Sequence, residues 1–432
     1  MVQGDVTAAP ANPGWRRWTE TWYLSYALLG ASVAGLAPIL LPLSIGKDGS
    51  IADIGLVMGA FNLGGLTAPV WGGIADRKGQ HRLLLVSGLL ATAFALFIFP
   101  FVLSIEGRIL LALVQGAGAA SAATVANLAI VEVHPRAEWD ERIGWLQTFY
   151  GGGQVLGLLL AGFTSGPALT TGFVVAAAIT FFAILPAMRI KSGPRDQPLT
   201  RPVVRHPSRH AELSAGSPQS FYHHLNVRAF RHVVDNLFSP LGVFLCAWFV
   251  SFAGAAALFS LYPVLMKNVF GVDPSLSSIG FAVAASISLF VYAPAGRWSR
   301  NRGPLRVLDA GLIIRVLAFT AMIVLGMFEL SGRGPLALAS FAFVVVAWSL
   351  LSVAGTEITA QFSEEHEGEG LGLFNASTSI AGVVGAVVGG WTAERWGYNS
   401  VLILGILGSI AGIVLAAAVS RLKRSQVREE ET

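Results

Sequence analysis

Residues 72–82 read Gly72-Gly73-Ile74-Ala75-Asp76-Arg77-Lys78-Gly79-Gln80-His81-Arg82 and join two long apolar stretches. A degraded copy returns one half-chain later as Gly296-Arg297-Trp298-Ser299-Arg300-Asn301-Arg302-Gly303. Glycine permits a tight turn between two antiparallel helices, and the charges between the glycines stay outside the hydrocarbon. A charged turn that joins apolar stretches once in each half-chain indicates two related helix bundles in tandem.

The composition excludes an ordinary soluble domain. Of 432 residues, 54% are hydrophobic and 12% are charged, whereas soluble domains carry roughly 25% charged residues. Apolar runs of about 20 residues recur, and each is long enough to cross a hydrocarbon core of roughly 30 Å. These runs are continuous rather than alternating, so they predict membrane helices and not barrel strands.

We predict twelve spans in two pseudo-symmetric six-helix bundles, an all-α membrane fold. The bundles occupy residues 1–189 and 237–432, the second with a short tail, and a cytoplasmic linker covers 190–236. The first span is too long and too far from the N-terminus for a cleaved signal peptide, so we expect it to be retained. The spans are predicted at residues 22–45, 51–75, 83–104, 109–132, 143–164, 170–189, 238–266, 275–298, 306–329, 335–361, 370–391 and 398–420.

Basic residues predict the orientation of the spans, because Lys and Arg collect in cytoplasmic loops. With both termini inside, most of the 29 Lys and Arg residues fall in inner segments. We therefore expect a multi-pass protein of the plasma (inner) membrane with both termini in the cytoplasm. The net charge of +4 follows from this bias. It attracts anionic lipid headgroups and does not indicate nucleic acid.

The linker is hydrophilic and rich in proline and histidine. His206 and His210 have the i, i+4 spacing of a metal site, but no cysteine or carboxylate cluster completes one. We expect a solvated linker without a metal, with a short amphipathic helix near residues 225–234 on the membrane surface.

The repeat extends beyond the charged turn. Pro38 in the first span corresponds to Pro263 in the seventh, and Glu132 near the end of span four corresponds to Glu357 near the end of span ten. Six spans separate the copies, so both halves cross the membrane in the same sense. Such a parallel repeat is expected for two halves related by an axis along the membrane normal.

The turn Gly72-x-Ile74-Ala75-Asp76-Arg77-x-Gly79 resembles the motif between spans two and three of the major facilitator superfamily. Twelve spans, a long central linker and the half-chain repeat extend this resemblance over essentially the whole chain. Gln80 and His81 depart from the family's last two basic positions, and Arg300 replaces the aspartate in the copy. The resemblance implies a transporter whose two bundles rock about a site near the bilayer midplane.

The resemblance also implies that the turn latches the bundles together on the cytoplasmic side in the outward-open state. Asp76 would lie near the N-terminal end of a helix of the other bundle, where the macrodipole attracts negative charge. Arg77 would bridge to Glu132. The alternative is a loop charge cluster that only determines orientation. The expected latch residues are Gly72, Asp76, Arg77, Gly79, Glu132, Gly296, Arg300 and Gly303.

Small residues near i, i+4 spacing follow spans five and eleven, and in lipid such faces let helices pack closely. Span five also resembles the antiporter signature G-x-x-x-G-P-x-x-G-G of drug-exporting branches, with Leu158 at its proline and Ala161 at one glycine. In span four, Ala112 stands where such exporters often carry an arginine. These departures weaken the case for their proton-exchange mechanism. The expected packing glycines are Gly153, Gly157, Gly162, Gly385 and Gly389.

Ionisable residues inside a membrane are costly and therefore functional candidates. Glu357 and Arg315 are expected about 8 and 15 Å from the inner ends of spans ten and nine, by helical rise. They could meet as a structural ion pair if their side chains extend toward each other. Alternatively, Glu357 is a proton-coupling carboxylate.

Solute contacts are then expected to be uncharged, in a cavity that the family forms from spans one, four, seven and ten, flanked by two, five, eight and eleven. Such a cavity favours neutral or amphipathic solutes over dianions. Each candidate has helix packing as its alternative role. The candidates are Tyr26, Asn62, Gln115, Asn127, Gln147, Tyr150, Gln154, Trp248, Tyr292 and Asn375.

We predict a secondary transporter that works by alternating access. Proton-coupled efflux is the first choice, and uptake or facilitated diffusion of a sugar-like or other metabolite is the second. No G-x-x-x-x-G-K-[ST] loop occurs, so no nucleotide is expected, and no clustered side chains indicate an enzyme. A scaffold or sensor that binds partners through the linker and tail is the alternative of another class. We expect a monomer without cofactors, whose partners are the solute, protons and the lipid bilayer.

Overall fold

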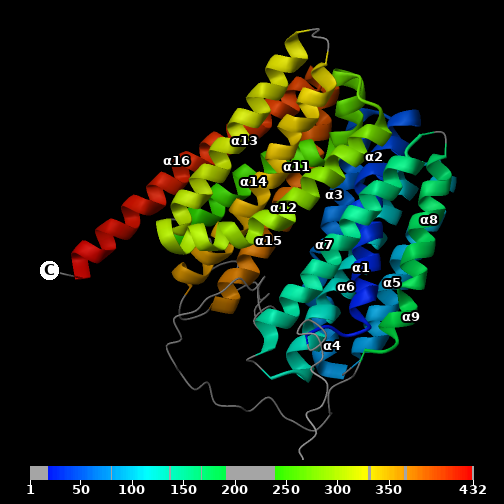
Figure 1. Cartoon of the computed structure of the whole chain (residues 1–432), viewed down its shortest axis with the longest axis horizontal. Helices are drawn as coiled ribbons and strands as arrows, with labels where there is room; N and C mark the ends of the chain where they lie inside the picture. Colours follow the sequence, from blue (N-terminus) through cyan, green and yellow to red (C-terminus); the bar gives the residue numbers. More distant parts are fainter. Residues whose placement is uncertain are drawn as a thin grey trace, which may run out of the picture.

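The computed structural model describes residues 18–78, 80–135, 138–166, 168–190, 239–328, 332–363 and 367–430. Every regular element in these residues is a helix, and the helices form two bundles side by side (Figure 1). The predicted all-α fold of two six-helix bundles is confirmed. The predicted linker and its amphipathic helix lie outside the described residues, apart from Ile190.

The N-terminal bundle contains six spans, some of which are built from two or three consecutive elements. Its helices are α1 (Tyr23–Leu29), η2 (Gly30–Leu36), α2 (Ala37–Asp48), α3 (Ile51–Gly65), α4 (Ala68–Lys78), α5 (His81–Ile98), η3 (Phe99–Phe101), α6 (Ile105–Val133), α7 (Trp139–Thr164), α8 (Leu169–Phe182) and α9 (Ile184–Ala187).

The C-terminal bundle has longer, uninterrupted helices. The last of them continues well beyond the predicted end of its span, because residues 421–430 are mostly good helix formers. Its helices are α11 (Pro240–Phe270), α12 (Pro274–Arg302), α13 (Pro304–Met327), α14 (Arg333–Phe362), α15 (Glu367–Trp396) and α16 (Asn399–Glu430).

Eleven helical segments in the described residues are long and apolar enough to cross a membrane. The twelfth predicted span is α7, which is a helix of 26 residues but lacks such an apolar window. Charged residues in its first turns and the amides Gln147 and Gln154 lower its hydropathy. Because α7 packs against α1 in its own bundle and α12 in the other, part of its surface faces protein, where this polarity is tolerated.

The first span contains a π-helical segment, η2, between two α-helical parts. Such segments are rare and take up about one extra residue in a turn. The second span is broken differently. Leu66 and Thr67 form a turn before Pro69, which has no N–H to continue the helical hydrogen bonds.

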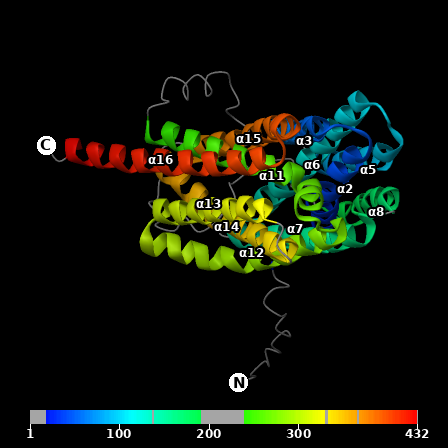
Figure 2. The same cartoon turned by 90° about the horizontal axis from the view of Figure 1, so that it is seen from above.

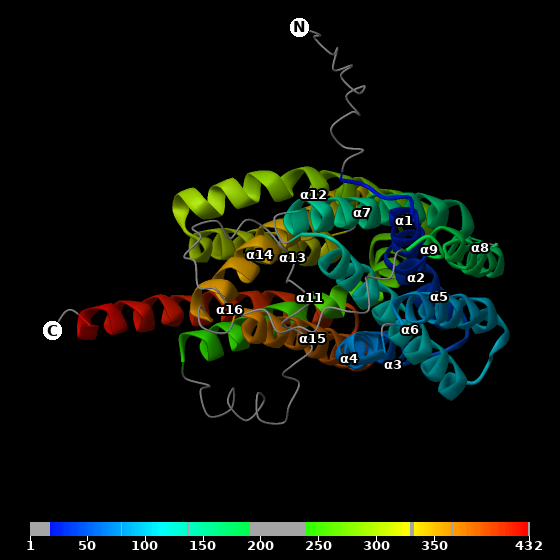
Figure 3. The same cartoon turned by 90° about the horizontal axis from the view of Figure 1, so that it is seen from below.

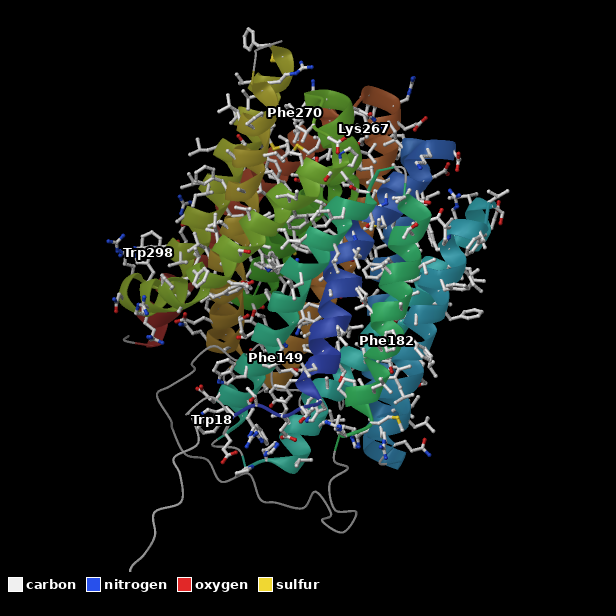
Figure 4. All side chains as sticks on the ribbon, turned by 45° about the vertical axis from the view of Figure 1, so that its right-hand side comes forward. Trp18, Phe149, Phe182, Lys267, Phe270 and Trp298 are labelled. Atoms are coloured by element: carbon white, nitrogen blue, oxygen red, sulfur yellow. The ribbon has the colours of Figure 1, made fainter. Side chains whose placement is uncertain are left out.

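The bundles meet mainly through four helix pairs, α3 with α15, α7 with α12, α2 with α11, and α3 with α11 (Figure 2, Figure 3). We call the end that carries Ile190 and Ser239 the linker end and the opposite end the far end. In Figure 4, Trp18 and Phe149 lie toward the linker end, and Lys267 and Phe270 at the far end.

The closest backbone approach between the bundles lies in the far-end halves of α3 and α15. The helices α7 and α12 also meet near their middles, where a Cβ on Gly151 would lie 2.8 Å from Leu289 Cδ2. A Cβ on Gly55 would lie 2.5 Å from the carbonyl oxygen of Ala386, and one on Gly162 would lie 3.1 Å from Ile279 Cγ1. The ribbons spread apart toward the linker end (Figure 1). The bundles therefore hold each other mainly at the far end.

Candidate functional site

Four predicted cavity residues from three helices meet in the N-terminal bundle. The Tyr26 phenol on α1 hydrogen-bonds with the side chains of Gln147 on α7 and Asn127 on α6. The rings of Tyr26 and Tyr150 have centroids 4.8 Å apart. We call these four residues the amide–phenol cluster. Its groups can both donate and accept hydrogen bonds and carry no charge.

Glycines on α7 position this cluster. A Cβ on Gly153 would lie 1.8 Å from the Ala27 carbonyl oxygen, and one on Gly157 would lie 2.0 Å from that of Ala31. Only glycine allows backbones to approach so closely. Since Ala27 follows Tyr26 in the chain, this contact sets the distance between Tyr26 and α7.

Glycines on α15 pack in the same way against α11 in the C-terminal bundle. A Cβ on Gly385 would lie 2.2 Å from the carbonyl oxygen of Ala253, and one on Gly389 would lie 2.6 Å from Ala257 Cβ. The two bundles thus bring a glycine-rich helix against their first spans by the same contact.

An aromatic cluster lies beside this contact. The ring centroid of Trp248 on α11 lies 4.5 Å from that of Phe374 on α15 and 5.9 Å from that of Trp348 on α14. Phe252 stacks on Trp248 at 6.2 Å, and Trp248 Nε1 donates to Thr378 Oγ1 at 2.7 Å. We call Trp248, Phe252, Trp348 and Phe374 the indole cluster. Its rings offer apolar area, and the Trp248 N–H is engaged by Thr378.

Of the indole cluster, the sequence analysis singled out only Trp248. Trp348 carried a usable signal, because tryptophan collects at membrane interfaces and this one lies in the middle of a span. The predicted residue Tyr292 on α12 joins the cluster from the side, through contacts with Trp348, Ser349 and Ser352.

The other four cavity candidates join neither cluster through a contact between described residues. Asn62 lies at the seam between the bundles, where a Cβ on Gly382 would be 3.1 Å from its amide. Gln115 is fully buried, and its amide atoms have no protein partner among the described residues. Gln154 and Asn375 are half-buried on α7 and α15.

The ion pair suggested for Glu357 and Arg315 is not formed. Glu357 on α14 accepts hydrogen bonds from Ser299 on α12 and, at 3.4 Å, from Gln361. Arg315 on α13 is completely buried, and its Nε and Nη2 have no partner among the described residues. Helical rise gave the depth of the two residues but not the direction of their side chains, and Glu357 faces α12.

The structure covers the expected latch only in part. Gly72 is buried on α4, whereas the side chains of Asp76, Arg77 and Glu132, together with Gly79, lie outside what is described.

More of the C-terminal copy of the turn is described. Gly296 is buried, Arg300 stands in the last turn of α12, and Gly303 has a positive φ of 85°, which favours glycine. Ser299 in this copy is the residue that donates to Glu357.

A carboxylate joins the bundles at the far end. The oxygen Oε2 of Glu394 on α15 accepts from the backbone N–H groups of Ile51 at 2.7 Å and Ala52 at 3.3 Å. These groups begin α3, where Ser50 and Asp53 already form a capping box. Glu394 therefore completes the N-terminal cap of a helix in the other bundle. The sequence analysis did not single it out, because nothing local to residue 394 indicates its partner.

An ionic cluster joins the chain just before α1, the end of α6 and the start of α7 at the linker end of the N-terminal bundle. Glu20 Oε1 lies 2.7 Å from His134 Nε2 and 3.5 Å from Arg142 Nη1. Arg142 also pairs with Glu138 at 2.9 Å. Only the i, i+4 spacings of His134 with Glu138 and of Glu138 with Arg142 were readable from the sequence.

These features define a multi-pass membrane protein built from paired helix bundles, the architecture of solute transporters. The model of the Major Facilitator Superfamily matches residues 22–358 and also 246–432, and the chain therefore belongs to that superfamily of membrane transporters. This confirms the resemblance found in the charged turn, and it places the protein in a family of transporters rather than enzymes.

Curated relatives match nearly the whole chain. The "Multidrug resistance protein MdtG" of Klebsiella pneumoniae (strain 342) is 26% identical over 96% of this chain and 95% of its own. That of Escherichia coli O9:H4 (strain HS) is 25% identical over 94% of this chain and 93% of its own.

Two solved structures are similar in fold. The nucleoside transporter NupG has a TM-score of 0.70 at 13% identity, over 93% of this chain and 97% of its own. A D-xylose–proton symporter has a TM-score of 0.66 at 13% identity, over 92% and 95% of the two chains. At these identities the likeness concerns the fold alone.

Proposed function

We propose that this protein is a secondary transporter that exports a small neutral or amphipathic solute from the cytoplasm in exchange for protons. The solute is held between the amide–phenol cluster and the indole cluster. Both termini lie in the cytoplasm of a cell whose plasma (inner) membrane holds the protein.

The observation that carries this proposal is the pairing of two uncharged clusters, one in each bundle. The amide–phenol cluster supplies hydrogen bonds and the indole cluster supplies apolar area, and neither contains an ionised side chain. A dianion in such a site would lack a counter-charge, whereas an amphipathic solute matches both surfaces.

Whole-chain similarity to proteins named for multidrug resistance supports export as the direction. Ala112 and Leu158 replace residues that are typical of proton-coupled exporters, so the proposed coupling to protons is argued from a different residue. We propose that Glu357 is the coupling carboxylate, because it is half-buried in a span and its hydrogen bond from Ser299 joins α14 to α12.

Alternating access requires contacts that hold the bundles at one end and release at the other. In this proposal, the far-end contacts of Gly55 and Glu394 hold the bundles together in the inward-open state. The charged turn at residues 72–79, with Glu132, is the latch of the opposite state.

The test begins with purified full-length protein, screened by thermal shift against neutral, cationic, sugar-like and amphipathic compounds. A hit is then measured as flux in liposomes with and without an imposed pH gradient. We expect amphipathic compounds to stabilise the protein and flux to follow the gradient. Glu357→Gln is expected to abolish gradient-driven flux while solute exchange without a gradient continues.

Trp391→Ala is the control, because this tryptophan is exposed on the outside of α15. Stabilisation by sugar-like compounds alone, with uptake of the same compounds by cells that express the protein, would support uptake instead. If none of the tested compounds binds or is transported, and the linker captures partner proteins, the scaffold alternative is supported.

A further inference from the structure

A groove on the outer side of the N-terminal bundle lies between α5 and α9 at the linker end. These two helices run side by side (Figure 1). The groove has a volume of about 490 Å³, and its lining includes Arg82, Leu83, Val86, Leu90 and Met188. None of the residues to which we assigned solute, protons or gating lines it.

The wall of the groove is apolar and faces the surroundings of the protein. Leu83 is 60% exposed, Leu90 is 44% exposed and Met188 is 49% exposed. Leu83, Val86 and Leu90 follow one face of α5 at helical spacing over about 10 Å. That length falls within one leaflet of a bilayer whose core is roughly 30 Å thick. The wall therefore fits an acyl chain that runs along α5.

The mouth of the groove is cationic. Arg82 is exposed, and its Nη2 donates to the carbonyl oxygen of Met188, which fixes the guanidinium beside the groove. Its other N–H groups have no partner among the described residues. Arg189, the next residue after Met188, is also exposed. No carboxylate among the described residues lines the groove to neutralise them.

The exposed Arg82 guanidinium borders this apolar wall, and exposed Arg189 directly follows the lining residue Met188 in the chain. This arrangement matches the phosphate and the chain of an anionic phospholipid. Guanidinium forks bind phosphate oxygens in pairs, and their position at the end of the spans is the depth of headgroups. The uncapped first turn of α5 adds a partial positive charge at the same end.

We propose that this groove is a binding site for one anionic phospholipid. The phosphate lies on Arg82 and Arg189, and an acyl chain lies along Leu83, Val86 and Leu90. The proposal depends on the protein being in a membrane but not on the solute, the direction of transport or the coupling ion.

The test uses full-length protein in detergent and counts bound lipids by native mass spectrometry during titration with phosphatidylglycerol or with phosphatidylcholine of the same chains. We expect the wild type to retain phosphatidylglycerol preferentially. Arg82→Gln combined with Arg189→Gln should weaken its binding tenfold or more, because each basic group near an anionic headgroup contributes about fivefold. Val86→Trp, which fills the groove, should weaken the binding of both lipids.

Arg302→Gln combined with Arg306→Gln is the matched control, since it removes the same charge from exposed positions at the linker end of the other bundle. Inorganic phosphate at millimolar concentration should not displace the lipid, because it lacks the chain. The proposal fails if the control loses as much phosphatidylglycerol, or if the wild type binds both lipids equally.

Arg82→Gln also removes a contact within the protein, so Arg189→Gln alone provides a second test. Arg189 is exposed at the end of the bundle, and its loss should leave the melting temperature unchanged. It should still weaken phosphatidylglycerol binding about fivefold. Unchanged lipid binding in this variant would contradict a role for Arg189 in holding the phosphate.

Discussion

The two bundles share their backbone construction but differ in the chemistry of their interiors. In both, a glycine on the fifth span of the bundle approaches a backbone carbonyl of the first span. Gly157 on α7 approaches the carbonyl of Ala31, and Gly385 on α15 approaches that of Ala253 on α11. Beside these contacts, one bundle carries amides and phenols and the other carries indole and phenyl rings. The repeat therefore preserved helix packing, which any functional bundle needs, while the side chains beside the contacts diverged.

In the proposed function, this difference gives the two bundles separate tasks. The amide–phenol cluster can discriminate solutes by hydrogen bonds, whose geometry is directional. The indole cluster contributes area that many shapes can share. A transporter with both surfaces can recognise a polar group on one side of the solute and tolerate variation on the other.

The largest expected effects test what the bundles share. Gly157→Leu and Gly385→Leu would each force a side chain against a backbone carbonyl at about 2 Å. We expect each to destabilise the protein by about 3 kcal/mol or more, because helix backbones cannot yield as side chains do. The measurement is thermal or denaturant unfolding in detergent, together with the yield of monodisperse protein.

The repeat supplies matched controls for these variants. Gly144 and Gly372 also correspond in the two halves, and a Cβ at either position meets no described atom within 4 Å. Leucine at these positions should change stability little. If only one of Gly157→Leu and Gly385→Leu is harmful, the bundles do not share this packing requirement.

The next effect tests how the bundles differ. Trp248→Ala removes the centre of the indole cluster and should weaken binding of an amphipathic solute about 10- to 100-fold, through several lost aromatic contacts. Tyr26→Phe removes only hydrogen bonds and should weaken the same solute about 3- to 10-fold. Equilibrium binding to purified variants, with Trp248→Phe as the conservative control, compares them. Equal losses for polar and apolar solutes in both variants would refute the division of tasks.

A smaller effect concerns the contact between the bundles. Glu394→Ala leaves two N–H groups of α3 without their partner from α15. A lost helix cap contributes about 1 kcal/mol, so the population open at the far end should rise about fivefold. Pulsed EPR distances between labels at Lys47 and Lys267, both exposed at the far end, measure this shift. Arg395→Ala should leave the distances unchanged, and an identical shift there would mean that the effect is not specific to the cap formed by Glu394.

The smallest effect concerns the ionic cluster of the N-terminal bundle. Glu20→Gln removes the group that joins His134 and Arg142. Because these ion pairs are partly exposed, we expect the free energy of unfolding to fall by about 1 kcal/mol or less, and the difference to shrink with added salt. Unfolding at low and high salt, with Glu141→Gln as the control, measures it. A loss that is independent of salt would indicate a packing role for Glu20.

The fold could be predicted because continuous apolar runs and a repeated turn are properties of the sequence itself. Even α7, whose hydropathy is low, was placed correctly, since the span predicted at residues 143–164 lies within Trp139–Thr164. The four residues of the amide–phenol cluster were each predicted as cavity candidates, because the family arranges their spans around one cavity. Their contacts with one another were not predicted.

What could not be predicted depends on side-chain direction and on the register between bundles. Glu357 and Arg315 were expected to pair because their depths allowed it, but the rotation of each helix turns them apart. Glu394 and Ile51 lie far apart in the sequence and meet only through the packing of α15 on α3. No local pattern encodes such a contact.

The π-helical segment at Gly30–Leu36 means that the first span contains about one residue more than a continuous α-helix of the same length would need. Deleting a single residue there would return the segment to α-helix and turn the preceding part by about 100° about its axis. Tyr26 would then swing away from Gln147 and Asn127, while the portion from Ala37 to Asp48 kept its place. The orientation of this phenol is thus set by a backbone insertion, and selection can re-aim it by a change of length as readily as by a substitution.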